Sequence, residues 1–212
     1  MKKLLLFCFI LIITYSCFSQ ELINISLPAP KTSGGKPLME ALKDRQTQRS
    51  FSSQKLSDQQ LSDLLWAAFG INRPENSRRT APSAVNWQET DIYVSLESGI
   101  YIYDAKKNEL TAIAGGDHRK DMGKQGFAAD AAVMLIFVAD YSKMGLVTPK
   151  ENKDFYSAVD AGYISQNVYL YCSSENLSTV VLGMIDRDKI KELLKLKEDQ
   201  KVILSQCVGF PK

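Results

Sequence analysis

The segment Ala131–Ala139 constrains the fold of this chain more than any other, because it is apolar at every position. Its length is that of one β-strand, and it shows no alternation between apolar and polar side chains. A strand of this composition has no face that it can present to water, so other elements must cover both of its faces. The segment therefore predicts a central strand in a sheet that is packed on both sides.

Shorter segments rich in β-forming residues supply the neighbours of this strand. Asp91–Leu96 and Gly99–Tyr103 are separated only by Glu97 and Ser98, which is typical of a β-hairpin. Further strands are expected over 110–113, after a turn at 106–108, and over 201–208. Hairpins of this kind, without repeated βαβ units, predict antiparallel pairing.

Helical patterns lie between these strands and predict an α+β fold with a central, mostly antiparallel sheet flanked by helices. Ser57 is the expected N-cap of one helix, with Gln60 completing a capping box and Gly70 ending the helix. Asp186 is the expected cap of the last helix. Other helices are predicted over 38–46, 118–128 and 151–174, and residues 72–82 are predicted to form a loop.

The N-terminus has the pattern of a secretory signal over residues 1–20, with a charged start, a short apolar run and small residues before a cleavage site after Ser19. The apolar run is too short to span a bilayer, so no transmembrane helix is expected. The protein is therefore expected to be exported, with a periplasmic location, and lipidation of Cys17 is the alternative. An extended lead-in over 21–37 then precedes one domain over 38–212.

The charge and the reactive residues exclude several classes of function. The net charge is +2, with basic and acidic residues interspersed, which argues against a nucleic-acid partner. The one histidine, His118, lies in a polar loop, and no histidine-rich metal site or Gly-x-Ser-x-Gly motif is present. Cys172 and Cys207 lie in apolar settings, as buried thiols or as a disulfide. No side chain is therefore expected to be catalytic, and the sequence points to a bound cofactor or to no chemistry.

One polar stretch has the residue types of a cofactor site. Arg45 and Arg49 lie four residues apart at the end of the predicted first helix, with Thr47 between them. A guanidinium group is a planar, permanently charged donor that suits a phosphate or an electron-rich ring. The alternative is that these cations only offset the negative end of a helix dipole.

Six segments of the chain, in order, resemble the nitroreductase superfamily of flavin enzymes, most closely its branch of azoline-oxidising dehydrogenases. They are residues 45–51, 79–86, 91–104, 160–167, 176–183 and 208–211. The resemblance implies a homodimer that binds FMN noncovalently at the subunit interface. It also implies an oxidoreductase that transfers a hydride through flavin N5 between an unknown donor and a small organic acceptor. An exported flavin- or ligand-binding protein without turnover is the alternative function.

The resemblance assigns roles to residues by their place in these segments. Arg45 would hold the FMN phosphate, with Gln46 and Thr47 nearby, and Arg49 would lie near the pyrimidine edge of the ring. The residues that would line the ring on one side are Pro82, Ser83, Ala84 and Asn86, and those on the other side are Val181, Leu182 and Gly183. The backbone N–H of Gly183 would face flavin N5. Without the family, the residue pattern itself favours a structural role for these residues, in turns and in helix packing.

Two positions depart from the pattern of the family. Glu89 lies three residues after Asn86, where many members carry a basic residue, so Arg49 would supply most of the positive charge at the ring edge. The sequence also stops at Lys212, where many members continue into a basic segment that completes the phosphate site. Lys212, or one of Arg73, Arg78 and Arg79, would then take over that role.

Overall fold

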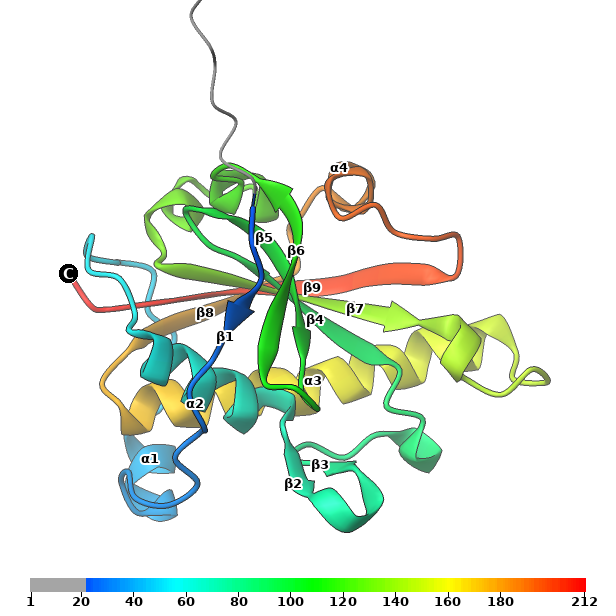
Figure 1. Cartoon of the computed structure of the whole chain (residues 1–212), viewed down its shortest axis with the longest axis horizontal. Helices are drawn as coiled ribbons and strands as arrows, with labels where there is room; N and C mark the ends of the chain where they lie inside the picture. Colours follow the sequence, from blue (N-terminus) through cyan, green and yellow to red (C-terminus); the bar gives the residue numbers. More distant parts are fainter. Residues whose placement is uncertain (1–21) are drawn as a thin grey trace, which may run out of the picture.

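The computed structural model describes residues 22–212, which form one sheet with helices packed against both faces (Figure 1). The predicted signal peptide over residues 1–20, its cleavage site after Ser19 and Cys17 lie outside the described residues. The sheet has seven strands in the order β1-β6-β5-β4-β7-β9-β8. Every neighbouring pair is antiparallel, which confirms the predicted α+β class.

Five of the seven strands of the main sheet follow the predicted segments, whereas Ile25–Ser26 and Ser178–Leu182 were not predicted as strands. Those of the main sheet are β1 (Ile25–Ser26), β4 (Thr90–Ser95), β5 (Gly99–Asp104), β6 (Glu109–Gly115), β7 (Val133–Asp140), β8 (Ser178–Leu182) and β9 (Gln200–Gly209). The region predicted as a loop over 72–82 instead contains a small separate hairpin, formed by β2 (Ile71–Arg73) and β3 (Arg78–Arg79). Lead-in residues of β1 pair with β6 and so extend the sheet at one edge.

Strand β7 is the central, doubly covered strand that its composition predicts. It pairs with β4 on one side and with β9 on the other. Leu135 and Phe137 belong to the core under α2 and α3, whereas Met134 and Ile136 belong to the core on the opposite face. All four side chains are fully buried. Truncating a core residue such as Phe137 to alanine typically costs about 3–5 kcal/mol, so this strand is a major source of stability.

Four α-helices cover the sheet: α1 (Leu38–Asp44), α2 (Asp58–Phe69), α3 (Lys150–Ser174) and α4 (Arg187–Leu193). Helices α2 and α3 lie on one face, and α4 lies on the other with two 3-10 turns (Figure 1). Those turns, Arg119–Met122 and Gly126–Asp130, replace the single helix predicted over 118–128, because Gly123 has extended backbone geometry between them. None of the helices within residues 22–212 combines the length and apolarity needed to cross a membrane.

The predicted helix ends are confirmed at α2 and α4. The Ser57 side chain accepts the Gln60 N–H, and the Gln60 side chain accepts the Ser57 N–H, which forms the capping box. The Asp186 carboxylate accepts the Lys189 N–H at the start of α4. These hydrogen bonds satisfy backbone donors that have no partner inside a helix.

The first helix is shorter than predicted, and this changes how the two arginines are presented. Helix α1 ends at Asp44, so Arg45 is its C-cap and the chain to Arg49 is not helical. The Gln48 N–H donates to the Thr179 carbonyl of the edge strand β8 at 3.0 Å. An unpaired strand edge offers backbone partners, and pairing with it competes successfully with another turn of helix.

Candidate functional site

Tyr169 on α3 joins two of the segments that the sequence assigns to a cofactor. Its hydroxyl oxygen accepts the backbone N–H of Val181 at 3.1 Å and lies 3.1 Å from the Thr47 hydroxyl. The Arg45 guanidinium lies over the same ring, 5.5 Å from its centroid. Residues from three distant parts of the chain therefore meet at one buried aromatic side chain, as a cation–π pair and two hydrogen bonds.

This cluster opens into a positively charged cleft of about 560 Å³ between α1, α3 and β8. Lys36, Lys43 and Arg45 line the cleft, and Asp44 is its only acidic lining residue. Lys36 pairs with Asp44 at 3.2 Å, which leaves two further cations beside the cavity. The excess of positive charge suits an anionic group such as a phosphate. Gln46 also lines this cleft.

Arg49 is exposed, and among residues 22–212 no hydrogen bond or ion pair involves its guanidinium group. Because the chain from Arg45 to Arg49 is not helical, four residues can span up to about 13 Å. The same four residues in a helix would rise only about 6 Å. The non-helical chain therefore allows a larger separation of the two arginines than one turn of helix would.

The predicted ring-lining segment Pro82–Asn86 forms a strained turn. Val85 and Asn86 have φ values of 51° and 57°, and Gln88 follows with 50°. Left-handed backbone is unfavourable for residues other than glycine, most of all for a β-branched one such as Val85. Such strain costs about 1–3 kcal/mol for each residue and persists only where neighbouring groups impose it. A turn of this kind is a candidate functional element.

The groups that impose this conformation come from both sides of the turn. The Ala84 N–H donates to the Asp160 carboxylate on α3 at 2.8 Å. The Gln88 N–H donates to the Ser83 hydroxyl at 3.0 Å, and the Gln88 amide donates to the Asn86 side-chain oxygen at 3.2 Å. The Asn86 side-chain amino group has no hydrogen-bond acceptor among residues 22–212, and Asn86 is exposed. It is thus available to a ligand that lies against the turn.

Two of the arginines considered for the phosphate site have structural roles instead. The Arg79 guanidinium donates to the Gln88 side chain at 2.9 Å and to the Phe69 carbonyl at 3.0 Å. Arg73 donates to the Arg79 carbonyl at 3.0 Å. Both arginines therefore support the turn from behind, through the hairpin of β2 and β3.

Lys212 also lies away from the cleft beside Arg45. It lines a different cleft, of about 650 Å³, together with Phe51, Lys55 and Arg119. The preceding residue, Pro211, does line the cleft beside Arg45. Within one chain, Lys212 thus does not line the cavity that Arg45 lines.

Glu89, three residues after Asn86, is buried. Its side chain is 0% exposed and lies beside Asp160, which is 2% exposed. Burial, and to a smaller extent the nearby Asp160 carboxylate, raise the pKa of Glu89 to about 7. Burial likewise raises the pKa of Asp160. The acidic side chain at this position therefore lies in the protein interior, close to Asp160.

The segment Val181–Gly183 lies at the end of β8. Leu182 is buried in the core, whereas Val181 is half-buried and Gly183 is exposed. A side chain at Gly183 would meet its nearest atom, in Leu204, at 3.8 Å, so nothing in this chain requires a glycine there. The close backbone approach predicted at Gly183 would be to a group outside this chain.

The predicted site residues form two groups along α3. Asp160 anchors the Pro82–Asn86 turn, and Tyr169 anchors Arg45, Thr47 and Val181. Nine residues of helix separate the two anchors, which corresponds to about 14 Å along the helix axis. Tyr169 itself was not identified from the sequence, because nothing in its local pattern distinguishes it from a core tyrosine.

The remaining reactive side chains form no second site. Within residues 22–212, no group of three or more His, Cys, Asp or Glu residues has the geometry of a metal site. Cys172 and Cys207 are free and buried, as the buried-thiol interpretation predicts, and burial raises the pKa of both thiols. His118 contacts the Gly115 carbonyl and Asp121 in its own loop.

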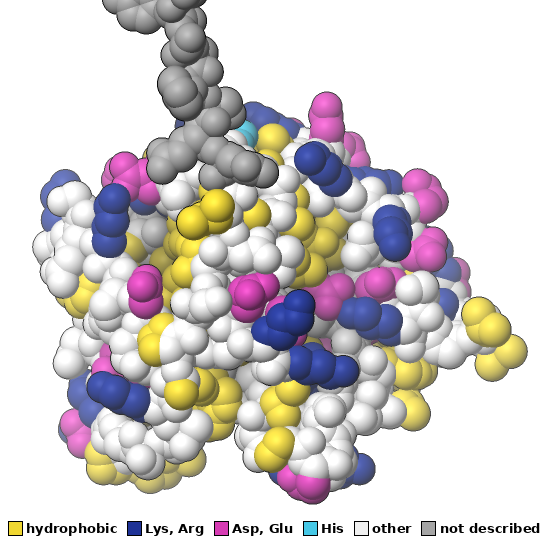
Figure 2. Space-filling view, viewed as in Figure 1, with side chains coloured by type: hydrophobic (Ala, Val, Ile, Leu, Met, Phe, Trp, Pro, Cys, Tyr) yellow, Lys and Arg dark blue, Asp and Glu magenta, His cyan; other side chains and the backbone are white. Residues whose placement is uncertain are grey.

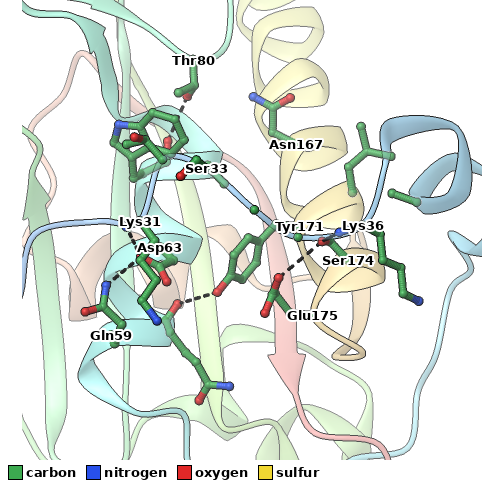
Figure 3. Close-up of a pocket in the computed structure, with 18 of the residues that line it drawn as sticks. Lys31, Ser33, Lys36, Gln59, Asp63, Thr80, Asn167, Tyr171, Ser174 and Glu175 are labelled. Carbon is green, nitrogen blue, oxygen red and sulfur yellow. Dashed lines mark hydrogen bonds between the residues drawn. The ribbon is translucent and has the colours of Figure 1, made fainter.

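A cleft larger than these two, of about 900 Å³, lies between the lead-in, α2 and α3 (Figure 3). Its polar groups bond mainly to one another. Asp63 accepts the Lys31 N–H at 2.7 Å and the Gln59 amide at 2.9 Å, and the Tyr171 hydroxyl donates to the Gln60 carbonyl. None of the site residues predicted from the sequence lines this cleft.

Comparison with known proteins identifies relatives over almost the whole described chain. Residues 42–210 match the model of the nitroreductase family. A protein named as a nitroreductase from Methanocaldococcus jannaschii is 31% identical over 172 residues, which cover 76% of this chain and 85% of the relative. An NADPH-flavin oxidoreductase from Vibrio harveyi is 26% identical over 170 residues, which cover 77% of this chain and 61% of the relative. A crystal structure of a Ralstonia eutropha protein, also named as a nitroreductase, superposes with a TM-score of 0.85 at 40% identity, covering 89% of this chain and 90% of the other.

Removing the Tyr169 hydroxyl should loosen the junction of α3, β8 and the Arg45–Arg49 segment. Tyr169→Phe keeps the ring under Arg45 but leaves the Val181 N–H without its acceptor. We expect a loss of about 1–3 kcal/mol in the free energy of unfolding, measured by urea denaturation, and faster amide exchange at Val181. Tyr171→Phe, which removes a hydroxyl two residues away on the same helix, is the control. Unchanged exchange at Val181 in Tyr169→Phe would contradict this role.

Proposed function

Because this chain belongs to the nitroreductase family, we propose that it is an FMN-dependent oxidoreductase that passes electrons from an unidentified donor to a small organic acceptor. The observation that carries the proposal is the junction at Tyr169, where Arg45, Thr47 and Val181 meet beside a positively charged cleft. When bound, FMN supplies hydride transfer through its N5 atom. The protein then needs no nucleophile or metal of its own.

The residues present fit the two chemically different ends of FMN. The cations of the Arg45 cleft match the phosphate, and Arg45, Gln46 and Thr47 would hold it. Arg49 would lie near the pyrimidine edge, where reduction places negative charge on N1 and O2. A fixed cation there stabilises the reduced form and raises its potential. Gly183 would offer its backbone N–H toward N5 beside Val181 and Leu182.

A homodimer would bring the two groups of site residues together. In one chain, the Pro82–Asn86 turn and the Arg45 cluster lie at different places along α3, and each would meet the other group from a partner. Large apolar side chains are exposed on α1, on the Pro82–Asn86 turn and on α3, with Met39 75%, Val85 82% and Phe155 63% exposed. Figure 2 shows such side chains at the lower edge of the molecule, over α1. Sedimentation should therefore give the mass of a dimer.

Within the family, we assign the chain to the branch of azoline-oxidising dehydrogenases. The support is the sequence resemblance of the six segments named above, of which residues 160–167 lie on α3. In this branch the substrate is oxidised, so electrons would enter FMN from an organic compound. This direction agrees with an exported protein, because NADPH and NADH are not expected outside the cytoplasm.

The first test is whether the purified protein holds a flavin that turns over. We expect a yellow protein that is bleached by an anaerobic donor and recoloured by an acceptor such as a nitroaromatic compound or a quinone. A flavin that stays oxidised with every donor except dithionite would instead favour the alternative, a binding protein without turnover. A folded dimer that remains colourless in excess FMN would contradict both.

Replacing the two arginines one at a time should affect two different properties, the affinity for FMN and the reduction potential of the bound flavin. Arg45→Ala removes a charge-assisted contact to phosphate, and we expect FMN binding to weaken about tenfold to a hundredfold with little change in potential. Arg49→Ala should instead lower the reduction potential by about 30 mV or more, with a smaller loss of affinity. Lys106→Ala, an exposed cation in the turn after β5, is the control. Equal effects of both arginine variants on both quantities would contradict the assignment.

We further propose that the protein is exported to the periplasm, on the basis of the signal pattern over residues 1–20. The full-length precursor should be processed so that the mature chain begins at Gln20, which mass spectrometry of the secreted protein would show. A lipidated chain beginning at Cys17, lost in Cys17→Ser, would favour the lipoprotein alternative. An unprocessed chain in the cytoplasmic fraction would contradict export.

A further inference from the structure

Two buried carboxyl groups, Glu89 and Asp160, lie directly behind the strained turn. Asp160 comes from the middle of α3, and Glu89 immediately precedes β4. Asp160 accepts the Ala84 N–H at 2.8 Å, both side chains are buried, and the Asp160 carboxyl group is close enough to raise the pKa of Glu89. The pair therefore connects the turn to both α3 and β4.

An orphaned atom indicates where the proton of this pair lies. Glu89 Oε1 has Thr90 Oγ1 at 3.5 Å as a weak donor, whereas Glu89 Oε2 is buried and has no partner that donates to it. A buried polar atom without a hydrogen bond is costly. A proton on Glu89, donated to the Asp160 carboxylate, removes this cost and the repulsion between two adjacent negative charges.

The surroundings offer no cation to replace this proton. From the loop after β7, Tyr141 faces Glu89, and its hydroxyl bonds Asp154, which in turn pairs with Lys150. Across the salt bridges of residues 22–212, none includes Glu89 or Asp160. Lys143, in the turn after β7, is already paired with Asp91 of β4.

We propose that Glu89 and Asp160 share one proton and act as positioning residues that hold the Ala84–Asn86 turn in its ligand-binding conformation. This inference rests on the proposed function, in which the turn lines the FMN ring. With one proton, the pair carries a single charge that the Ala84 N–H stabilises. With none, two carboxylates face each other without a cation, so Glu89 must move toward water.

Movement of Glu89 would release the turn, because Glu89 is only one residue from Gln88. Gln88 carries the contacts to Ser83 and Asn86 that impose left-handed backbone at Val85. Loss of the proton should therefore relax the strained conformation and weaken ligand binding. The pKa of Glu89, raised to about 7 mainly by burial, places this change near neutral pH. The sign is fixed: binding is strongest below the transition and falls as the pH rises.

The test compares the wild type with Glu89→Gln, whose amide N–H can still donate to Asp160 but cannot titrate. The first readout needs no flavin: Trp87 follows the turn and packs edge-on against Tyr156, 5.9 Å between ring centroids. We expect its fluorescence to change between about pH 6 and pH 8 in the wild type, and not in Glu89→Gln. Asp91→Asn, the same type of change two residues along the chain, should keep the transition.

The second readout is the FMN dissociation constant over the same range. Wild-type affinity should fall about tenfold between pH 7 and pH 8.5, and that of Glu89→Gln should change less than about twofold. Asp160→Asn is a second variant, in which loss of the neighbouring charge should move the fluorescence transition to lower pH. This variant keeps the test decisive if Glu89→Gln does not fold.

The outcomes separate this proposal from the proposed function. If the wild type and Glu89→Gln share one pH dependence, the pair does not position the turn. Loss of the wild-type fluorescence transition in millimolar calcium would also contradict the proposal. The pair would then hold a cation in place of a proton. If the fluorescence transition behaves as expected but no FMN binds at any pH, the role of the pair in the turn stands and the FMN proposal fails.

Discussion

The complete burial of β7 is the constraint on which the rest of the molecule depends. A strand with no polar side chain between Val133 and Ala139 requires cover on both faces. On one face, α2 and α3 provide this cover, so the inner side of α3 is committed to the core. Its remaining sides are then fixed in place by the sheet. Asp160 and Tyr169 project from α3 and contact the turn and the Arg45 segment. The site is therefore supported by a helix that the core holds rigid.

A structural element was predictable from the sequence when the interactions that form it lie between residues close together in the chain. The capping box at Ser57, the hairpin of β4 and β5 and the apolar run of β7 are all encoded within a few residues, and all were predicted correctly. The end of α1 is decided by pairing of Gln48 with β8, about 130 residues away, so the predicted helix was too long. Tyr169 and the buried position of Glu89 are likewise consequences of tertiary contacts.

The candidate site combines rigid support with local strain. Three left-handed residues, Val85, Asn86 and Gln88, lie within four positions, and none is a glycine. A glycine would adopt this backbone without cost but would also leave it free to relax. Non-glycine residues held by Asp160, Ser83 and Arg79 give one defined conformation instead. This pre-organisation would let the turn meet a flat ring without an ordering cost at the moment of binding.

The separation of the two anchors on α3 also explains the exposed apolar surface. A ligand that contacts both groups of residues within one chain would have to follow about 14 Å of helix, past side chains such as Tyr163, which is 47% exposed. If a second copy packs on this side, the exposed tyrosine and Phe155 become buried, and the turn of one chain approaches the cluster of the other. One association would then remove an apolar patch from water and complete the site. Binding of the cofactor and dimerisation should consequently be coupled, so that each increases the apparent affinity of the other.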